Sequence, residues 1–323
     1  MSGISDSFQR PINYLRISVT DRCNLRCIYC SPSGSFHHIP RKEMLTYEEI
    51  SHIAQTAAEL GISKIRLSGG EPLCRADITR LIHILDQIPG LEDISLTTNG
   101  ILLQQYAAEL KQTGLQRVNV SLDTLSRKKY QEITGLDKLD QVIEGINAAG
   151  KVGLKPIKIN MVVMGGLNDN EVTEFARLTR DEGWNIRFIE LMPFGDKHLQ
   201  FVGLKDILQR LRPLGNLSPC SAPKGNGPAK YYRFDGAKGT LGFITPISEH
   251  FCFLCNRLRL TADGKLLPCL MSDNSIDLLP SLRNGVQPKD LKQYINKAIA
   301  SKPKRHHINK DIHSSKKMSL IGG

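Results

Sequence analysis

Three of the chain's eight cysteines lie within one run of eight residues, Cys23-Asn24-Leu25-Arg26-Cys27-Ile28-Tyr29-Cys30. A tetrahedral zinc site and a fully protein-ligated [4Fe–4S] cluster each need four protein ligands, and this run supplies three. A cluster bound here would therefore keep one iron without a protein ligand, open to a cofactor. Three unrelated core cysteines, or part of a zinc site, are the alternatives that the spacing allows.

Length and composition favour a globular protein of about two domains. The 323 residues are 40% hydrophobic and 23% charged, as is typical of soluble chains. No apolar run reaches the ~18 residues of a membrane-spanning helix, and the stretch from Met1 to Tyr14 lacks the apolar segment of a secretory signal. These features predict a cytoplasmic protein without a membrane partner. In that reducing compartment the cysteines indicate metal binding rather than disulfides.

The net charge of +11 favours an anionic partner. The excess is greatest after Ser301, where Asp311 alone opposes six basic residues, most of which we expect to form a solvated tail: Lys302, Lys304, Arg305, Lys310, Lys316 and Lys317. A zinc-stabilised nucleic-acid-binding protein is the alternative class that this charge supports. Against it, aromatic residues make up only 6% of the chain and do not alternate with the basic residues, so no nucleic-acid partner is predicted.

Apolar segments of strand and helix length alternate through the first two thirds of the chain. Strands are predicted at 12–19, 64–67, 93–96, 116–120, 156–163 and 186–191, and helices at 47–60, 77–88, 103–112, 139–149 and 171–182. Strands separated by helices of this length imply a parallel sheet with right-handed crossovers. The α/β pattern predicts an incomplete (β/α)6 TIM-type barrel, with its site at the carboxyl ends of the strands.

The composition changes after Pro213, and residues 219–228 have the proline and glycine content of a linker. Short strands are predicted at 230–234, 239–244 and 257–260, with a hairpin turn at Asp263-Gly264 and a helix over 288–300. We therefore expect two domains, residues 1–215 and residues 216–323, of which the second is a smaller α+β domain. A unit of that size cannot close a large core unaided, so a metal site would stabilise it.

A second set of three cysteines lies in the C-terminal part of the chain. Cys252 and Cys255 form a C-x₂-C pair, and Cys269 follows. A zinc ribbon would need a second such pair, and His250 is the one nearby candidate for a fourth ligand. Two sets of three cysteines favour two clusters, each with one open iron, over a composite zinc site. The two remaining cysteines are interpreted as structural or incidental: Cys74 and Cys220.

The first cysteine run, with the aromatic Tyr29 before its last cysteine, resembles the signature loop of the radical S-adenosylmethionine (SAM) enzymes. Essentially the whole chain is similar to the GTP 3′,8-cyclase family of these enzymes, which begins molybdenum cofactor biosynthesis. Three stretches carry the similarity: Leu15-Arg16-Ile17-Ser18-Val19-Thr20-Asp21-Arg22, Arg257-Leu258-Arg259-Leu260 and the terminal Gly322-Gly323. A peptide-modifying maturase is the nearest alternative among radical SAM enzymes, although such enzymes usually carry more cysteines near the C-terminus.

The resemblance implies a role for each matching residue. One [4Fe–4S] cluster, whose open iron binds SAM, would be held by Cys23, Cys27 and Cys30. A second [4Fe–4S] cluster, whose open iron binds the guanine of GTP, would be held by Cys252, Cys255 and Cys269. SAM contacts are implied for Tyr29, Gly70, Ser121 and Met192. GTP contacts are implied for Arg16, Arg66, Thr97, Lys158, Arg257, Leu258 and Arg259.

The chemistry of several of these residues agrees with the roles that the resemblance implies. GTP carries about four negative charges, and a partly buried polyphosphate needs fixed cations. Strand alternation places Arg257 and Arg259 on one face and Leu258 on the other. Burying the charge of Lys158 within an apolar strand costs free energy unless an anion binds to it. Met192, taken alone, reads as a core methionine.

The reaction that the resemblance implies couples SAM cleavage to GTP cyclisation. SAM yields methionine and a 5′-deoxyadenosyl radical, which removes the ribose 3′ hydrogen; the carbon radical then attacks C8 of guanine. The product is 3′,8-cyclo-7,8-dihydro-GTP, and the enzyme would be classed as a carbon–carbon lyase. No catalytic side chain is predicted, because the cofactors carry the chemistry. The resemblance also implies an external one-electron reductant, a homodimer and transfer of the product to cyclic pyranopterin monophosphate synthase. The tail ending in Gly322-Gly323 is expected to help enclose the site.

Overall fold

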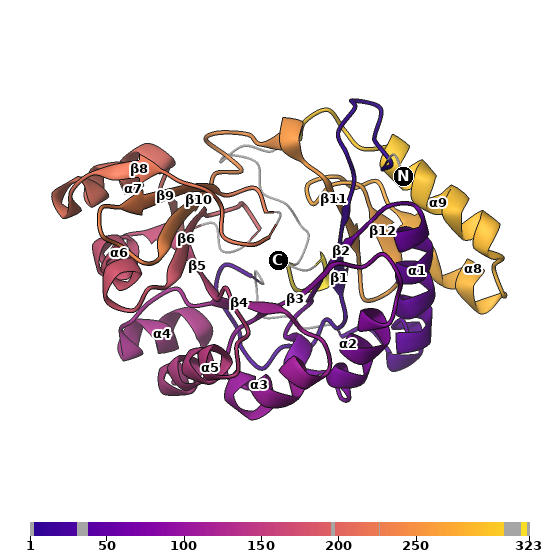
Figure 1. The fold of residues 1–323 in the computed structure, drawn as a ribbon, viewed down its shortest axis with the longest axis horizontal. Helices are drawn as coiled ribbons and strands as arrows, with labels where there is room; N and C mark the ends of the chain where they lie inside the picture. Colours follow the sequence, from indigo (N-terminus) through magenta and orange to yellow (C-terminus); the bar gives the residue numbers. More distant parts are fainter. Residues whose placement is uncertain (1–2, 31–37, 195–197, 226, 307–317, 322–323) are drawn as a thin grey trace.

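The computed structural model describes residues 3–30, 38–194, 198–225, 227–306 and 318–321. Its centre is a curved sheet in which six parallel strands follow one another in chain order: β1 (Tyr14–Ser18), β2 (Lys64–Ser68), β3 (Asp93–Thr98), β4 (Arg117–Ser121), β5 (Lys158–Gly165) and β6 (Asn185–Glu190). The sheet curves around an interior but does not close (Figure 1). This arrangement confirms the predicted incomplete (β/α)6 barrel.

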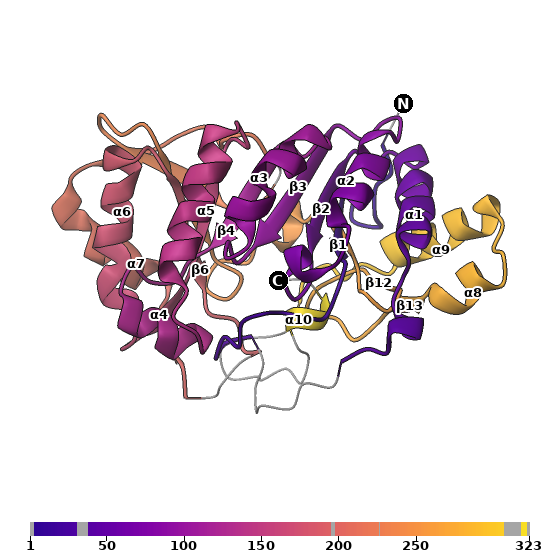
Figure 2. The ribbon, with the colours of Figure 1, turned by 90° about the horizontal axis from the view of Figure 1, so that it is seen from below.

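Helices cover the outer face of the parallel strands (Figures 1 and 2). They are α1 (Tyr47–Glu59), α2 (Ile78–Asp86), α3 (Leu103–Gln112), α4 (Arg127–Thr134), α5 (Leu139–Lys151) and α6 (Val172–Asp181). Thr46 caps α1 by accepting from the backbone N–H of Glu49, whose carboxylate accepts in return from the N–H of Thr46. The sequence did not predict α4, because a mostly polar segment in which few side chains are buried lacks a clear apolar stripe.

The last third of the chain lengthens the same sheet at both edges. At one edge β10 (Thr240–Ile244) pairs in parallel with β6, and the antiparallel strands β9 (Lys230–Phe234) and β8 (Leu217–Pro219) follow. At the other, β11 (Arg257–Leu260) pairs in parallel with β1, followed by the antiparallel β12 (Lys265–Leu267) and β13 (Ile276–Asp277). The three strands predicted after the linker are therefore present, but they extend the barrel's own sheet.

The remaining elements flank this sheet. The short strand β7 (Gln200–Phe201) pairs with β5, and the helices are α7 (Leu204–Leu211), α8 (Leu279–Arg283), α9 (Pro288–Ala300) and α10 (Met318–Ile321). Single 3₁₀ turns are η1 (Arg41–Glu43), η2 (Pro72–Cys74), η3 (Asp169–Glu171), η4 (Arg212–Leu214) and η5 (Cys252–Leu254). The helix predicted over 288–300 is α9, which packs on α1. Of the helices in the described ranges, none has both the length and the apolar character needed to cross a bilayer.

One apolar core joins the barrel to the C-terminal part of the chain. It contains Ile17 and Leu67 from the barrel strands together with Leu258 from β11 and Leu291 from α9. A smaller cluster places Ile321 of α10 against Phe194 and Leu267, with Met192 beside them. The C-terminal part thus shares the main core, and α10 is held near the carboxyl ends of the strands.

Candidate functional site

Two neighbouring cavities lie within the curve of the sheet, and each contains one of the two cysteine sets. The first cavity is lined by Cys23, Cys27 and Cys30. The second cavity is lined by Cys252, Cys255 and Cys269. Residues that line both are Thr97, Asn160, Ile189, Met192 and Met318. Molecules bound in the two cavities would therefore be separated by little more than single side chains.

The cysteine run of the first cavity is a loop anchored on the end of α4. The backbone N–H groups of Arg26 and Ile28 donate to the carbonyls of Thr134 and Ile133 at 2.8 and 3.0 Å. Within the loop, the N–H of Cys30 donates to the carbonyl of Cys27 at 3.0 Å. The unpredicted helix α4 therefore fixes the loop that carries the three thiols.

The thiols of the first cavity have the environment of metal ligands. The structure describes all eight cysteines and joins none of them by a disulfide. Burial raises the pKa of Cys23 to about 12, and burial together with the neighbouring Cys30 raises the pKa of Cys27. Three half-buried thiols that oppose one another's ionisation need a cation to become thiolates. Three cysteines with one ligand position left over fit a [4Fe–4S] cluster better than a closed zinc site.

Gly70 packs directly against the backbone that leads into the cysteine loop. Its N–H donates to the carbonyl of Thr20 at 2.7 Å, and the next N–H, of Glu71, donates to that of Arg22 at 2.7 Å. A Cβ on Gly70 would lie only 2.2 Å from the carbonyl oxygen of Arg22. Glycine is required here for packing against the loop, independently of any contact with SAM.

Replacing Gly70 by alanine should destabilise the fold by about 2 kcal/mol or more, because backbone atoms must move to accept the methyl group. Thermal unfolding and SAM binding would both be measured. The matched control is Gly150→Ala in α5, where the nearest atom to the new Cβ, on Ile157, is 3.7 Å away. Equal behaviour of the two variants would show that the contact with Arg22 relaxes at no cost.

Two buried carboxylates organise the remaining wall of the first cavity. Asp123 accepts from the hydroxyl of Tyr29 and from the N–H of Val162, both at 2.8 Å, and burial raises its pKa to about 6. Glu71 accepts from the N–H of Asn99 and the hydroxyl of Thr98, both at 2.7 Å, and burial raises its pKa to about 7. The four residues expected to contact SAM all line this cavity: Tyr29, Gly70, Ser121 and Met192. Asp123, which positions Tyr29, was not predicted.

The second cavity is lined by arginines, and the described part of its wall is not acidic. Five arginines line it, namely Arg16, Arg66, Arg187, Arg257 and Arg259, and none of the described residues around it is Asp or Glu. Strand register explains part of this grouping, since Arg16 on β1 lies opposite Arg66 on β2 and Arg259 on β11. Burial and neighbouring guanidinium groups lower the pKa of Arg16. Such a concentration of buried positive charge fits a polyanionic ligand.

Some residues that line the second cavity also carry a buried polar atom without a partner. Within the described ranges, Nε of Arg187, Oγ1 of Thr97 and Oδ1 of Asn160 are buried without a hydrogen-bond partner. Thr97 was expected to contact GTP, whereas Arg187 and Asn160 were missed by the sequence reasoning. Buried polar groups without partners are uncommon in native proteins, and a bound ligand is one explanation for them.

Lys158 lies beside the arginines but does not line either cavity. Its Nζ donates to the carbonyls of Pro223 and Lys224 in the linker, at 3.3 and 2.6 Å. Burial, Arg187 and Arg117 lower its pKa to about 6. A polyphosphate that reached Lys158 would therefore have to displace the linker carbonyls.

Burial in the fold bears on four residues interpreted from the sequence. Arg66 is 6% exposed and lines the second cavity. Met192 lines both cavities besides packing on the small core. Lys302 is not part of a solvated tail, since it is 3% exposed. Leu258, expected to contact GTP, has its side chain in the main core and away from both cavities.

Lys302 connects the segments that carry the second set of cysteines. Its Nζ donates to the carbonyls of Arg257 and Pro268, both at 2.7 Å, and lies 3.7 Å from Sγ of Cys255. Burial alone would raise the pKa of Cys255, but Arg257 and Lys302 outweigh it and bring the pKa to about 6. A thiolate held between cations is ready to ligate a metal cluster. The second set thus also fits a [4Fe–4S] cluster with three protein ligands.

Helix α10 lies between the two cavities. The N–H of Met318 donates to the carbonyl of Cys30 at 3.4 Å, and Arg259 donates to the carbonyl of Ile321 at 3.4 Å. The same short helix therefore contacts the cysteine loop of the first cavity and an arginine of the second. The terminal Gly322-Gly323, expected to help enclose the site, lie outside the described residues.

Two family models match consecutive parts of the chain. The model described as the radical SAM superfamily matches residues 17–179, and the one described as molybdenum cofactor synthesis C matches residues 184–308. The SAM-bound structure of SuiB from Streptococcus suis is similar to this chain with a TM-score of 0.59 at 17% identity, over 87% of this chain and 68% of that one. The AdoMet-bound structure of anSMEcpe gives a TM-score of 0.52 at 20% identity, over 63% and 58%. Both show the fold alone.

Curated relatives are much more similar. The GTP 3′,8-cyclase of Pelotomaculum thermopropionicum is 48% identical over 99% of this chain and all of the relative. That of Moorella thermoacetica is also 48% identical, over 99% of this chain and all of its own length. Similarity at this level over full length, together with both family models, excludes the peptide-modifying alternative. The chain belongs to the GTP 3′,8-cyclase family of the radical SAM superfamily.

Proposed function

We propose that this chain converts GTP to 3′,8-cyclo-7,8-dihydro-GTP in the first step of molybdenum cofactor biosynthesis, with SAM cleaved to 5′-deoxyadenosine and methionine. One observation supports this most directly: two adjoining cavities each contain three cysteines, and one of them is lined by five arginines and no described acid. The name of the full-length relatives, GTP 3′,8-cyclase, agrees with it. We assign the reaction to the carbon–carbon lyases.

In this proposal the first cavity holds a [4Fe–4S] cluster on Cys23, Cys27 and Cys30, together with SAM. When bound there, the cluster supplies the electron that cleaves SAM. Tyr29, kept in place by Asp123, contributes an aromatic wall. Gly70 allows the backbone to come close to the loop and its ligand. Ser121 offers a hydroxyl at the strand end, and Met192 closes the side toward the second cavity; all line the first cavity.

The second cavity holds GTP and a further [4Fe–4S] cluster on Cys252, Cys255 and Cys269. The arginines of β11, β1 and β2 face the triphosphate with fixed, planar donors. Thr97 and Lys158 add contacts, Lys158 after release of the linker carbonyls, and Leu258 contributes only through its backbone. The protein positions the ribose of GTP against the SAM cavity and excludes water, while no side chain is required as acid, base or nucleophile.

The buried position of the arginines distinguishes this proposal from a basic nucleic-acid-binding protein. A nucleic-acid interface displays its cations on the surface, where phosphates can reach them. Here Arg66, Arg187 and Arg259 are 6%, 2% and 5% exposed and turn inward. A mononucleotide can enter such a cavity, whereas a duplex cannot.

Several properties of the working enzyme belong to the same proposal. We propose a domain division into residues 1–215 and residues 216–323, a cytoplasmic location and a homodimer. An external one-electron reductant supplies electrons, and cyclic pyranopterin monophosphate synthase receives the product. No membrane or nucleic-acid partner is proposed.

Anaerobic incubation with GTP, SAM and a strong reductant tests the function. Protein reconstituted with iron and sulfide should be brown, contain about eight irons per chain if both cubanes are filled, and form the cyclised nucleotide together with 5′-deoxyadenosine. Chromatography with mass spectrometry would detect both products. Intact GTP beside active SAM cleavage would remove the cyclase assignment, and a colourless protein with stoichiometric zinc would remove the radical chemistry altogether.

Replacing Lys302 by methionine should weaken the second cluster, because two backbone carbonyls lose their donor and Cys255 loses a neighbouring cation. Loss of such supporting contacts typically lowers metal affinity by about 10- to 100-fold. Iron release to a chelator would be followed by absorbance. The exposed Lys304, two residues away, supplies the control Lys304→Met. Identical release rates would assign Lys302 no part in holding the cluster.

A further inference from the structure

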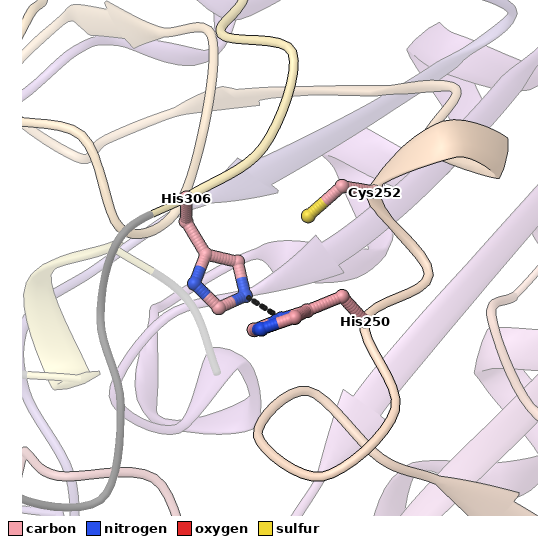
Figure 3. Close-up of side chains that lie close together, drawn as sticks. All are labelled: His250, Cys252 and His306. Carbon is pink, nitrogen blue, oxygen red and sulfur yellow. Dashed lines mark hydrogen bonds between the residues drawn. The ribbon is translucent and has the colours of Figure 1, made fainter.

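Two histidines approach Cys252 at the edge of the second cavity, and the proposed function gives neither of them a role. His250 precedes η5, while His306 follows α9, 56 residues later in the sequence. Figure 3 shows the sulfur of Cys252 pointing toward the two imidazole rings. The ligand atoms of His250, Cys252 and His306 all lie within 4.8 Å of one another. In the sequence only His250 lies close to the second set of cysteines, and nothing in the spacing links it to His306.

The spacing of the imidazole nitrogens suits a tetrahedral metal ion. Nδ1 of His250 lies 3.2 Å from Nε2 of His306, and the carbonyl oxygen of Pro246 lies 3.1 Å from the same Nε2. With metal–nitrogen bonds of about 2.0–2.1 Å, two ligands of a tetrahedral zinc ion lie about 3.3 Å apart. The two imidazoles therefore lie at a spacing that two ligands of one ion adopt, and the sulfur of Cys252 lies within 4.8 Å of a ligand nitrogen of each. An ion at this point would replace the proton shared between the two rings.

The side chain of Arg10 holds the segments that carry these residues together without a metal. Arg10 donates to the carbonyl of Cys252 at 2.7 Å and to the carbonyls of Pro303 and Lys304 at 2.8 and 3.2 Å. The Arg10 side chain is buried and paired with Asp6 at 2.6 Å. One guanidinium group thus ties the loop that carries Cys252 to the segment that ends at His306. A preformed arrangement lowers the entropic cost of binding an ion.

The donor set selects the class of ion. Two imidazoles and one thiolate suit zinc and similar borderline-soft cations, whereas calcium and magnesium prefer oxygen ligands. His250 is exposed and the other two residues are half-buried, so an ion can reach them from solvent. We propose that His250, Cys252 and His306 bind one zinc ion in the cluster-free protein, with water at the fourth position. Zinc binding itself does not depend on the proposed function.

One consequence does rest on the proposed function. Cys252 cannot ligate this zinc ion and the second [4Fe–4S] cluster at the same time, because the thiolate would have to reach two different centres. Zinc at this position would therefore exclude the second cluster while leaving the first cysteine set untouched. The histidine pair makes the second cluster site sensitive to zinc during assembly.

Titration of the cluster-free protein with cobalt, followed by displacement with zinc, tests the proposal. Visible absorption reports tetrahedral cobalt, and a chromogenic chelator gives the zinc affinity. His250→Ala, His306→Ala and Cys252→Ala should each lower the affinity at this site by at least about tenfold. Cys269→Ala is the decisive control, since Cys269 belongs to the second cysteine set but not to the histidine group. Cobalt bound by the first cysteine set gives the same absorption in every variant, so that contribution can be subtracted from each titration.

Two results would overturn the proposal: equal loss of zinc affinity in Cys252→Ala and Cys269→Ala, or unchanged affinity in both histidine variants. Circular dichroism would verify that each variant is folded, and the exposed position of His250 makes His250→Ala the safest of them.

Reconstitution with iron and sulfide beside equimolar zinc tests the consequence. The wild-type chain should retain about four irons, and a variant with both histidines replaced should reach about eight. Equal sensitivity of the two proteins would show that zinc competes through the cysteines alone, which contradicts the proposal. If the wild-type chain reaches only about four irons even without zinc, the two-cluster function fails, while the cobalt titration still decides the zinc site.

Discussion

Replacing Cys255 by alanine is expected to halve the iron content of the anaerobically reconstituted protein, from about eight to about four atoms per chain. Cys255 lines the cavity that contains the arginines and lies between Arg257 and Lys302, whose charges favour its thiolate. Removing this ligand should lower GTP cyclisation by roughly 100-fold or more. Cleavage of SAM should persist, because the first cysteine set lies in the other cavity. Iron analysis, with quantification of the cyclised nucleotide and of 5′-deoxyadenosine, would show whether cyclisation is lost while SAM cleavage persists.

The matched control is Cys220→Ala, in the linker region and outside both cavities. It should keep full iron content and full cyclisation. Unchanged iron in the Cys255 variant would contradict the assignment of a second cluster to this set. Loss of all iron would instead indicate that the two sets assemble as one unit.

Replacing Arg187 by glutamine is expected to weaken GTP binding by about 10- to 100-fold, as for loss of one charge-assisted hydrogen bond in a buried site. Arg187 lies on β6, is 2% exposed, and lines the second cavity. One of its terminal nitrogens donates to Asn119 at 2.7 Å, whereas its Nε is buried without a partner. A nucleotide that reached this side chain would give the unpaired donor a partner. Equilibrium binding of GTP to the anaerobic protein would give the change in affinity.

The exposed Arg233 on β9 provides a control of equal charge, Arg233→Gln. If both variants weaken binding equally, the effect comes from the overall charge and not from a contact in the cavity. If Arg187→Gln leaves GTP affinity unchanged, the triphosphate does not reach β6. Iron content should stay the same in both variants, because neither residue is a proposed ligand.

The barrel could be predicted because its local signals agree with its topology. Six apolar strand-length segments alternate with helical ones, and parallel pairing then follows from the length of the connections. The capping box at Thr46 marks the start of α1 within the sequence itself. Helix α4 was not predicted because it is short and mostly polar, and only Tyr130, Ile133 and Thr134 of it are buried. The pairing of β10 and β11 with the edges of the barrel could not be predicted, because the partner of a strand depends on the tertiary fold and not on the residues of that strand alone.

The residues of the site likewise fall into those that the sequence could reveal and those that only the fold brings together. The cysteine sets have fixed spacing and were visible as possible ligands in the sequence. Arg187, Asn160 and Asp123 were missed because their role depends on which way a strand residue faces and on what lies opposite. The burial of Lys302 could not be predicted, because nothing in the neighbouring sequence distinguishes a buried lysine from a solvated one. His306 likewise gained a partner only through the path of the chain after α9.

The pairing of β10 with β6 and of β11 with β1 has a consequence for any attempt to shorten this protein. A fragment ending at residue 215 would leave β1 and β6 as edge strands with unpaired backbone donors and acceptors, which favour association with other copies. It would also lose the apolar side chains that β11 and α9 contribute to the common interior. We therefore expect such a fragment to aggregate, and the full chain to melt in a single transition.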